Sequence, residues 1–168
     1  MSKLGLGADA VLTTTRALRK RLDFDRPVER SILEECLQIA LQAPSGSNAQ
    51  GWQFMLVTDA DKKAAIAGYY QKAFAAYENS PARPTNQHAD YPDLQQAQER
   101  VLNSAQYLAA NMARVPAMLI PCFNGRSDGM PYSIQAGIFG SIVPAAWSFM
   151  LAARERGIGT CWTTLHLD

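Results

Sequence analysis

The sequence has little of what several common classes of protein require. Its 168 residues include two histidines and three cysteines, and the cysteines lie far apart, at Cys36, Cys122 and Cys161. Without a closely spaced pair they predict no zinc site, and an odd number of scattered cysteines is typical of reduced thiols in a cytoplasmic protein. The formal net charge is only +1. It therefore gives no electrostatic argument for binding nucleic acid or an anionic membrane.

Long apolar runs are also scarce. The first residues show no apolar run behind a basic cluster, so we expect no signal peptide. Residues 131–153 come closest to a membrane span, but Pro144 and several small or polar residues interrupt them. A span needs about 20 predominantly apolar residues. These features together predict a cytoplasmic protein with no membrane partner.

Familiar catalytic motifs are missing as well. We find no Walker A motif, no Rossmann glycine fingerprint and no Gly-x-Ser-x-Gly elbow in the sequence. A serine hydrolase would need a histidine base, and His88 lies in a proline-rich segment over 79–92. Cys36 falls on the apolar face of a predicted helix, which favours a structural role. The sequence therefore predicts neither a catalytic side chain nor a metal site.

Hydrophobic periodicity predicts an alternation of long helices and short strands. In one helix, Ser31 and Glu34 have the spacing of a capping box. Strands separated by long helices indicate a layered α/β or α+β fold. The predicted helices cover 9–22, 30–42, 60–77, 93–113 and 131–156, and the predicted strands cover 53–57, 117–123 and 160–165.

The predicted helix over 131–156 is apolar on nearly every side. Ala136, Gly137, Gly140 and Ser141 are small enough to let another segment approach it closely. A helix of this kind must be buried all round, and a chain of this length can hardly surround it alone. A dimer interface is the simplest solution, and the alternative is a central helix within one monomer.

Two polar clusters could bind a ligand. Basic residues gather over 16–21, and arginine supplies the charge-assisted donors that a phosphate needs. The alternative for this cluster is a solvated helix end, where cations favour the helix dipole. The second cluster, over 44–50, combines small residues with hydroxyl and amide groups that donate and accept hydrogen bonds. It suits a flavin ring with its ribityl chain, although an ordinary loop after a helix has a similar composition.

Taken together, three segments resemble the FMN-dependent nitroreductase family. The first is the basic run Arg16–Arg21, followed by Pro27-Val28. The second, Ala43–Phe54, is very close to the family pattern Ala-Pro-Ser-x-x-Asn-x-Gln-Pro-Trp-x-Phe, with Gly51 in place of the proline. The third, Leu151–Trp162, resembles the end of the family's dimer-core helix and the Gly-Leu-Gly-Thr-Cys-Trp that follows it. Their order and spacing agree over nearly the whole chain.

The resemblance implies an α+β fold, a three-layer α/β/α sandwich that forms an intertwined homodimer with FMN at its interface. It also implies an oxidoreductase that passes electrons from NAD(P)H to small flat acceptors, such as nitroaromatics or quinones, by a ping-pong mechanism. The flavin would carry the chemistry while the protein positions it. The alternatives are a flavin-binding protein with little turnover, and ene reduction or dehalogenation on the same scaffold.

The resemblance also implies which residues meet the cofactor. Arg16 and either Arg19 or Lys20 would face the flavin, one of them holding the phosphate. Polar residues of the 44–50 turn would line the ring and ribityl chain, and the backbone after Trp162 would approach flavin N5. The full implied set is Arg16, Ala17, Arg19, Lys20, Pro44, Ser45, Ser47, Asn48, Gln50, Thr163, Thr164, Leu165 and His166.

Besides Gly51, the sequence departs from the family pattern at two places. Trp147-Ser148 replaces the Gln-Asn pair often found in the core helix, and the chain stops at Asp168. Family members usually continue with another helix, a fifth strand and an arm that embraces the partner. We therefore expect a single nitroreductase-like FMN-binding domain over 1–168 that lacks the C-terminal strand and arm.

Overall fold

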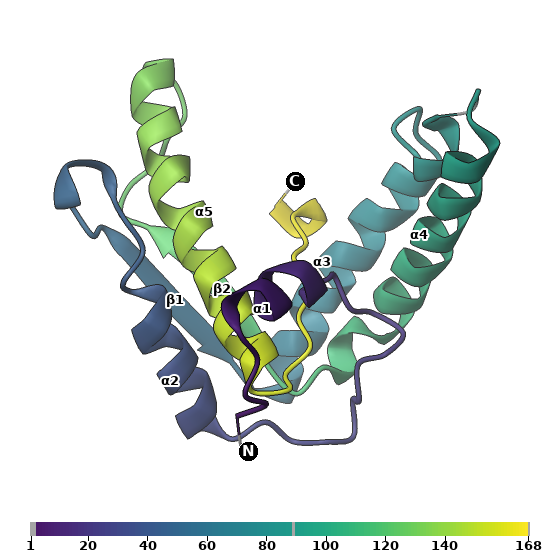
Figure 1. Cartoon of the computed structure of the whole chain (residues 1–168). Coiled ribbons are helices and arrows are strands. Elements are labelled where there is room, and N and C mark those ends of the chain that lie inside the picture. Colours follow the sequence, from purple (N-terminus) through teal and green to yellow (C-terminus); the bar gives the residue numbers. More distant parts are fainter. Residues whose placement is uncertain (1–2, 89, 168) are drawn as a thin grey trace. The chain divides into compact units, whose positions relative to one another are not determined.

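The computed structural model describes residues 3–88 and 90–167. The chain divides into two compact units (Figure 1). The first unit comprises Met1–Arg16, Arg26–Val57 and Ala117–Thr160, and the second comprises Ala17–Asp25, Thr58–Pro116 and Cys161–Asp168.

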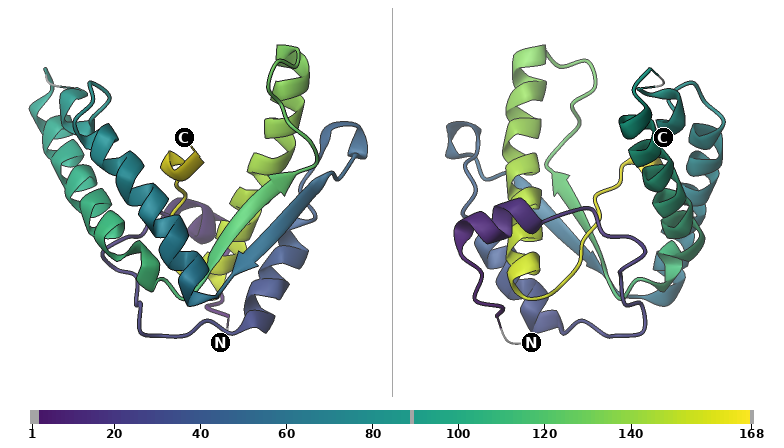
Figure 2. Two further views of the ribbon diagram at one scale, coloured as in Figure 1. Left: turned by 180° about the vertical axis from the view of Figure 1, so that it is seen from behind. Right: turned by 45° about the vertical axis from the view of Figure 1, so that its right-hand side comes forward.

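The first unit is built on a two-stranded antiparallel sheet. Strand β1 (Trp52–Val57) pairs with β2 (Met118–Phe123), in a register that runs from Trp52 opposite Phe123 to Val57 opposite Met118. The helices are α1 (Ala8–Thr14), α2 (Arg30–Ala40) and α5 (Tyr132–Glu155). Opposite views show α2 and α5 on the same face of the sheet (Figures 1 and 2).

Alternation along β1 decides which face of the sheet is covered. Trp52, Phe54 and Leu56 point to the same side because side chains alternate along a strand. Trp52 packs in a cluster with Ile142 and Ala145 of α5, and Phe54 joins this cluster. Met55 points to the other side and is 57% exposed. The hydrophobic pattern of the strand thus directs one face towards the helices.

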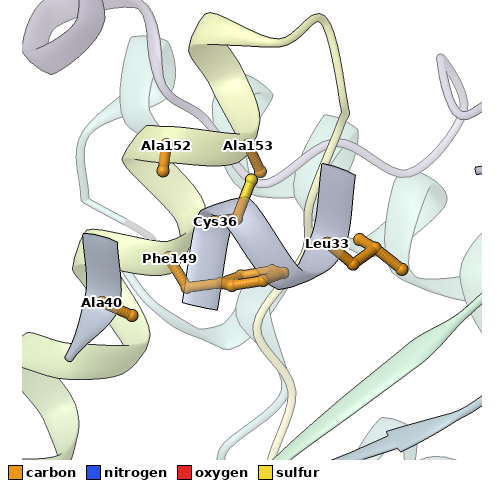
Figure 3. Close-up of a cluster of buried hydrophobic side chains, with 6 residues drawn as sticks. All are labelled: Leu33, Cys36, Ala40, Phe149, Ala152 and Ala153. Atoms are coloured by element: carbon orange, nitrogen blue, oxygen red, sulfur yellow. The ribbon is translucent and has the colours of Figure 1, made fainter. Parts of the chain in front are cut away.

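The contact between α2 and α5 forms the core of this unit. Cys36 of α2 and Ala153 of α5 are fully buried, beside Phe149 and Ala152 (Figure 3). Burial raises the pKa of the Cys36 thiol, with a smaller opposing effect from the charge of Arg156. The thiol therefore stays neutral in the core. The free energy of unfolding therefore depends on pH. The contribution of the neutral Cys36 thiol is fully present below the pKa of the unfolded thiol, and it is lost as pH rises through the raised pKa of the folded state.

The second unit contains α3 (Ala60–Glu78) and α4 (Pro92–Asn111). Helix α3 begins at an N-cap, Asp59, whose carboxylate accepts a hydrogen bond from the Lys62 amide at 2.9 Å. Tyr70 and Phe74 are buried on α3 and stack on each other. Short 3-10 turns cover Pro84–Asn86, Met112–Arg114 and Leu165–Leu167, and Gly46–Asn48 forms another in the first unit.

Four predicted helices and two predicted strands are confirmed, with bounds that shift by one or two residues. The first predicted helix, over 9–22, is wrong in its second half, because α1 ends at Thr14. Three consecutive threonines explain this end. The hydroxyls of Thr13, Thr14 and Thr15 donate to the carbonyls four residues before them, at 2.5–2.7 Å. Such bonds compete with the helix backbone, and Thr15 adopts an extended conformation.

Two further sequence predictions are corrected. Residues 160–165 form no strand in the described chain, since Thr160 makes only an isolated bridge and a 3-10 turn begins at Leu165. A segment with high strand propensity still needs a neighbour to pair with. The capping box at Ser31 is also wrong: Glu29 is the N-cap of α2 and makes no side-chain cap bond. Glu34 instead pairs with Arg30 at 2.7 Å.

Helix α5 is not buried on every side, as its composition suggested. Its second half packs on α2, but Ile134, Phe139, Val143 and Trp147 are 37–50% exposed. Only 33% of its most apolar 18-residue stretch is buried. By length and composition alone, the helix could cross a membrane. Core helices pass the same test, and the packing of Phe149 and Ala153 is that of a core helix. This chain therefore leaves much of the first half of α5 uncovered.

Removal of the Phe149 side chain should destabilise the first unit. Phe149 is 6% exposed, and a buried Phe→Ala change costs about 3–5 kcal/mol through lost transfer energy and a cavity. Tyr132→Ala, at a position that is 90% exposed on the same helix, should cost less than about 0.5 kcal/mol. Urea unfolding followed by circular dichroism measures both. Equal losses in the two variants would contradict the packing described here.

Candidate functional site

The turn after α2 has an unusual backbone. Ser47 and Asn48 both have φ of 52°, and Gln50 has φ of 47°. These values lie in the left-handed region, which few residues other than glycine occupy, and such conformations cost of order 1–3 kcal/mol each. A turn of this kind persists only where surrounding contacts hold it, and strained backbone of this type gathers at functional sites.

Polar groups of the turn hold it closed. The Ser45 hydroxyl accepts a hydrogen bond from the Gln50 amide at 3.0 Å, and the Asn48 amide donates to the Ser45 carbonyl at 3.0 Å. The Gln50 side chain donates to Asn48 Oδ1 at 3.1 Å. Ser47, Asn48 and Gln50 are nevertheless exposed. The turn therefore presents hydroxyl and amide groups on a fixed backbone.

A second contact ties the turn to α5. The Gly46 amide donates to Ser141 Oγ at 2.9 Å, and Ser141 Oγ donates to the Gly137 carbonyl at 2.6 Å. A Cβ atom at Gly46 would lie 3.7 Å from Ser141 Oγ and 3.9 Å from the Gly137 carbonyl oxygen. The turn thus lies against α5 at Ser141 and the Gly137 carbonyl, although a Cβ atom on Gly137 itself would meet nothing within 4 Å.

Only Arg16 adjoins a helix end, directly after the C-cap Thr15 of α1, so the helix-dipole explanation does not cover the rest of the cluster. Arg16 is exposed, and its Nη1 donates to the Thr15 carbonyl at 2.8 Å. In the second unit, Arg19 Nη1 donates to Ser104 Oγ at 3.3 Å, and the Lys20 ammonium donates to Asn103 Oδ1. Helix α4 therefore supplies the polar partners of both cations.

Arg19 differs from the exposed Lys20 in the surroundings of its donors. Its Nε is buried and has no hydrogen-bond partner among the described residues. Most buried polar groups are paired, so such a group requires an explanation. Cys161 lies near this guanidinium: burial raises the pKa of its thiol, while the charge of Arg19 and hydrogen bonding with it act in the opposite direction.

The last segment of the predicted site belongs to the second unit. The turn Leu165–Leu167 packs against α3, and the Leu167 amide donates to the Thr164 carbonyl at 3.0 Å. Thr163 is half-buried and Thr164 is exposed. The side chain of His166 lies outside the described part of the structure.

The predicted residues thus fall into two groups. One group belongs to the first unit and the other to the second. Sequence reasoning did not assign a role to Ser141, Asn103 or Ser104. Only Ser141 gave a signal, as one of the small residues in an otherwise apolar helix. The first group is Arg16, Pro44, Ser45, Ser47, Asn48 and Gln50, and the second is Ala17, Arg19, Lys20, Thr163, Thr164, Leu165 and His166.

A pocket elsewhere in the first unit is not built from these residues. It has a volume of about 580 Å³ and lies where α1, the end of α2 and the end of α5 meet. Leu12, Ile39 and Leu151 line it together with other apolar residues and with the polar or charged Lys3, Ser148, Glu155 and Arg156. No residue of the 44–50 turn contributes to its wall, so this pocket is separate from the candidate site at the turn.

A strained, exposed polar turn beside an antiparallel pair of strands and a long apolar helix characterises this α+β protein. The chain belongs to the nitroreductase family, whose model matches residues 13–168. This match confirms the resemblance of the three sequence segments. Among curated relatives, the 4-nitrobenzoate reductase of Pseudomonas putida is 26% identical over 171 residues, covering 91% of this chain and 70% of that protein.

Solved structures with the same fold agree with this assignment. Iodotyrosine deiodinase bound to FMN and 3-iodo-L-tyrosine has a TM-score of 0.65 at 22% identity, covering 92% of this chain and 72% of that one. The FMN-dependent nitroreductase NfnB from Mycobacterium smegmatis, solved in complex with NADPH, has a TM-score of 0.61 at 21% identity, with the same coverage of 92% and 72%. They confirm the predicted α+β nitroreductase-like fold.

Removal of the Arg19 charge should raise the pKa of the Cys161 thiol, because the guanidinium favours the thiolate. In Arg19→Gln, the pH midpoint for alkylation of Cys161 by iodoacetamide should move upwards. Lys20→Gln is the matched control, since Lys20 is not among the groups that affect this thiol. Mass spectrometry of the Cys161 peptide across pH gives the midpoint. A midpoint that stays in place or moves downwards in Arg19→Gln would refute the coupling.

Proposed function

We propose that this chain binds FMN and acts as an NAD(P)H-dependent oxidoreductase that reduces small flat acceptors such as nitroaromatics or quinones. The observation that carries the proposal is the turn over 45–50, with three left-handed residues that carry side chains and a closed set of hydrogen bonds. Its sequence matches the most specific motif of the family to which the chain belongs.

The donors and acceptors of the turn fit a flavin. An isoalloxazine ring offers carbonyl and ring-nitrogen acceptors and one imide donor, so it needs groups that both donate and accept. Exposed Asn48 and Gln50 provide amides of this kind, and Ser47 adds a hydroxyl. We propose Pro44, Ser45 and these three residues as flavin contacts.

The phosphate requires cations with free donors. Both cations keep unused donors, since Lys20 gives one of its three N–H groups to Asn103 and the buried Nε of Arg19 has no partner in the described structure. Arginine also binds phosphate oxygens with a fork of donors. We therefore propose Arg19 rather than Lys20 for this role. Arg16, Ala17 and the backbone of Thr163, Thr164, Leu165 and His166 stay proposed contacts.

Bound FMN would supply the two-electron chemistry that side chains alone do not perform. The residues of the chain bind and orient it. A guanidinium beside the pyrimidine edge of the flavin ring would stabilise the negative charge that the ring gains on reduction. We assign no side chain as a proton donor or acceptor.

The choice of electron donor and acceptor rests on named relatives. The curated relative is a 4-nitrobenzoate reductase, and NfnB was solved with NADPH. We propose that NAD(P)H and a flat acceptor use one site in turn, which gives ping-pong kinetics. We also infer a cytoplasmic location, which the free thiols of Cys36, Cys122 and Cys161 favour.

We further propose that the chain works as a homodimer. Phe139, Val143 and Trp147 follow one another at four-residue spacing and leave an apolar stripe exposed along α5. Exposed apolar patches on a folded protein are typical of interfaces. A second copy packed along α5 would bury these side chains and satisfy the all-round apolar composition of the helix.

The purified protein should bind FMN and lose its yellow colour when NAD(P)H is added without oxygen. Asn48→Asp removes the amide donor while keeping a residue that tolerates the left-handed backbone, and it should raise the FMN dissociation constant about tenfold or more. Asn86→Asp, at an exposed position in the second unit, makes the same charge change and should leave the constant unchanged. Fluorescence titration of FMN measures both variants.

Turnover distinguishes an enzyme from a protein that only holds flavin. Steady-state oxidation of NAD(P)H with 4-nitrobenzoate or a quinone should give parallel lines in double-reciprocal plots, as ping-pong kinetics require. A protein that stays colourless with added FMN would refute the proposed function. Stoichiometric FMN with negligible turnover would refute the enzymatic part and favour flavin storage.

Disruption of the apolar surface on α5 should produce a monomer. Val143 and Val101 have similar exposure, 37% and 41%, but Val101 lies on α4. Val143→Arg places a charge in the proposed interface and should halve the molar mass measured by light scattering, whereas Val101→Arg should leave it unchanged. A wild-type chain that already has the mass of one copy would refute the homodimer.

A further inference from the structure

Ser141 occupies a distinctive position on α5. Its hydroxyl donates to the Gly137 carbonyl one helical turn earlier, at 2.6 Å, and accepts the Gly46 amide at 2.9 Å. A hydroxyl has one hydrogen and two lone pairs. Because the hydrogen is directed to Gly137, the lone pairs are free for the Gly46 N–H. The helix thus fixes the direction in which Ser141 accepts.

The turn needs such an anchor. Three of its residues, Ser47, Asn48 and Gln50, hold the left-handed conformation at a cost in free energy. The bonds that Gln50 donates, from its backbone N–H to Ser45 Oγ and from its side chain to Asn48 Oδ1, lie within the turn itself. They close the turn but do not fix its place on the protein. The bond from Gly46 to Ser141 joins the turn to a helix 95 residues further along the chain.

The space around Gly46 supports the same conclusion. A Cβ atom there would come no closer than 3.7 Å to Ser141 Oγ, which is ordinary van der Waals contact. The backbone of the turn therefore rests directly against α5. The distance from the Gly46 amide to the serine hydroxyl leaves no room for a bridging water.

We propose that Ser141 is a positioning residue for the 45–50 turn, which it orders before the ligand arrives. This inference rests on the proposed function in so far as the ligand is FMN. Ser141 acts through the Gly46 amide and does not itself touch the cofactor. Removal of its hydroxyl leaves the exposed Gly46 N–H free to bond with water, so the turn loses order while the fold keeps its stability.

Three variants test the proposal in the full-length protein. Ser141→Ala removes the anchor, and Ser141→Thr keeps a hydroxyl that can still bond to the carbonyl four residues earlier. Ser148→Ala is the matched control, because Ser148 is a half-buried serine on the same helix that lines the pocket beside α1. The readouts are amide exchange of Gly46 by nuclear magnetic resonance, the FMN dissociation constant and the midpoint of thermal unfolding.

In Ser141→Ala, we expect Gly46 exchange to accelerate about tenfold and the FMN dissociation constant to rise about tenfold, equivalent to ~1.4 kcal/mol. Ser141→Thr should restore both quantities, and Ser148→Ala should leave both unchanged. The unfolding midpoint should stay constant throughout. Rescue by threonine distinguishes positioning from a general loss of packing.

The outcomes separate this inference from the proposed function. Unchanged Gly46 exchange in Ser141→Ala overturns the inference, whether or not FMN binds. Faster exchange with an unchanged FMN constant overturns the link between the anchor and the ligand. If the wild-type chain binds no FMN but Gly46 exchange accelerates in Ser141→Ala, the proposed function fails and the ordering role of Ser141 is supported.

Discussion

The packing of α2 on α5 is the contact on which the first unit depends. Cys36 and Ala153 are fully buried where the two helices meet, and Phe149 fills the adjacent space. Small residues let the helix backbones approach, and close packing makes such a contact sensitive to any change in volume. Because α2 leads directly into the polar turn and α5 holds Ser141, this contact brings the turn and its anchor together.

The turn shows how a stable scaffold supports a costly local conformation. Residues with side chains in the left-handed region destabilise a chain unless other contacts offset the cost. Here the offset comes from bonds within the turn and from the bond between Gly46 and Ser141. The result is a set of hydroxyl and amide groups that are exposed and yet held in place, which is the arrangement expected of a site that is ordered before it binds.

The basic residues illustrate the limits of local reasoning. The composition of the first 22 residues indicates one helix with cations at its end, but the threonines at 13–15 end α1 early. Propensity scales treat threonine as only mildly unfavourable in a helix. They omit the competition of its hydroxyl for backbone carbonyls. Likewise, Arg19 and Lys20 are equivalent in the sequence, and only their partners on α4 distinguish them.

The sequence by itself determined the four longer helices, two strands and the residues of the polar turn, because hydrophobic period and turn composition are local properties. It could not determine that residues 160–165 form no strand, since pairing needs a neighbour from elsewhere in the chain. Nor could it show that Ser141 holds the turn, or that one face of α5 stays uncovered. Those features join residues far apart in sequence, so only the tertiary structure decided them.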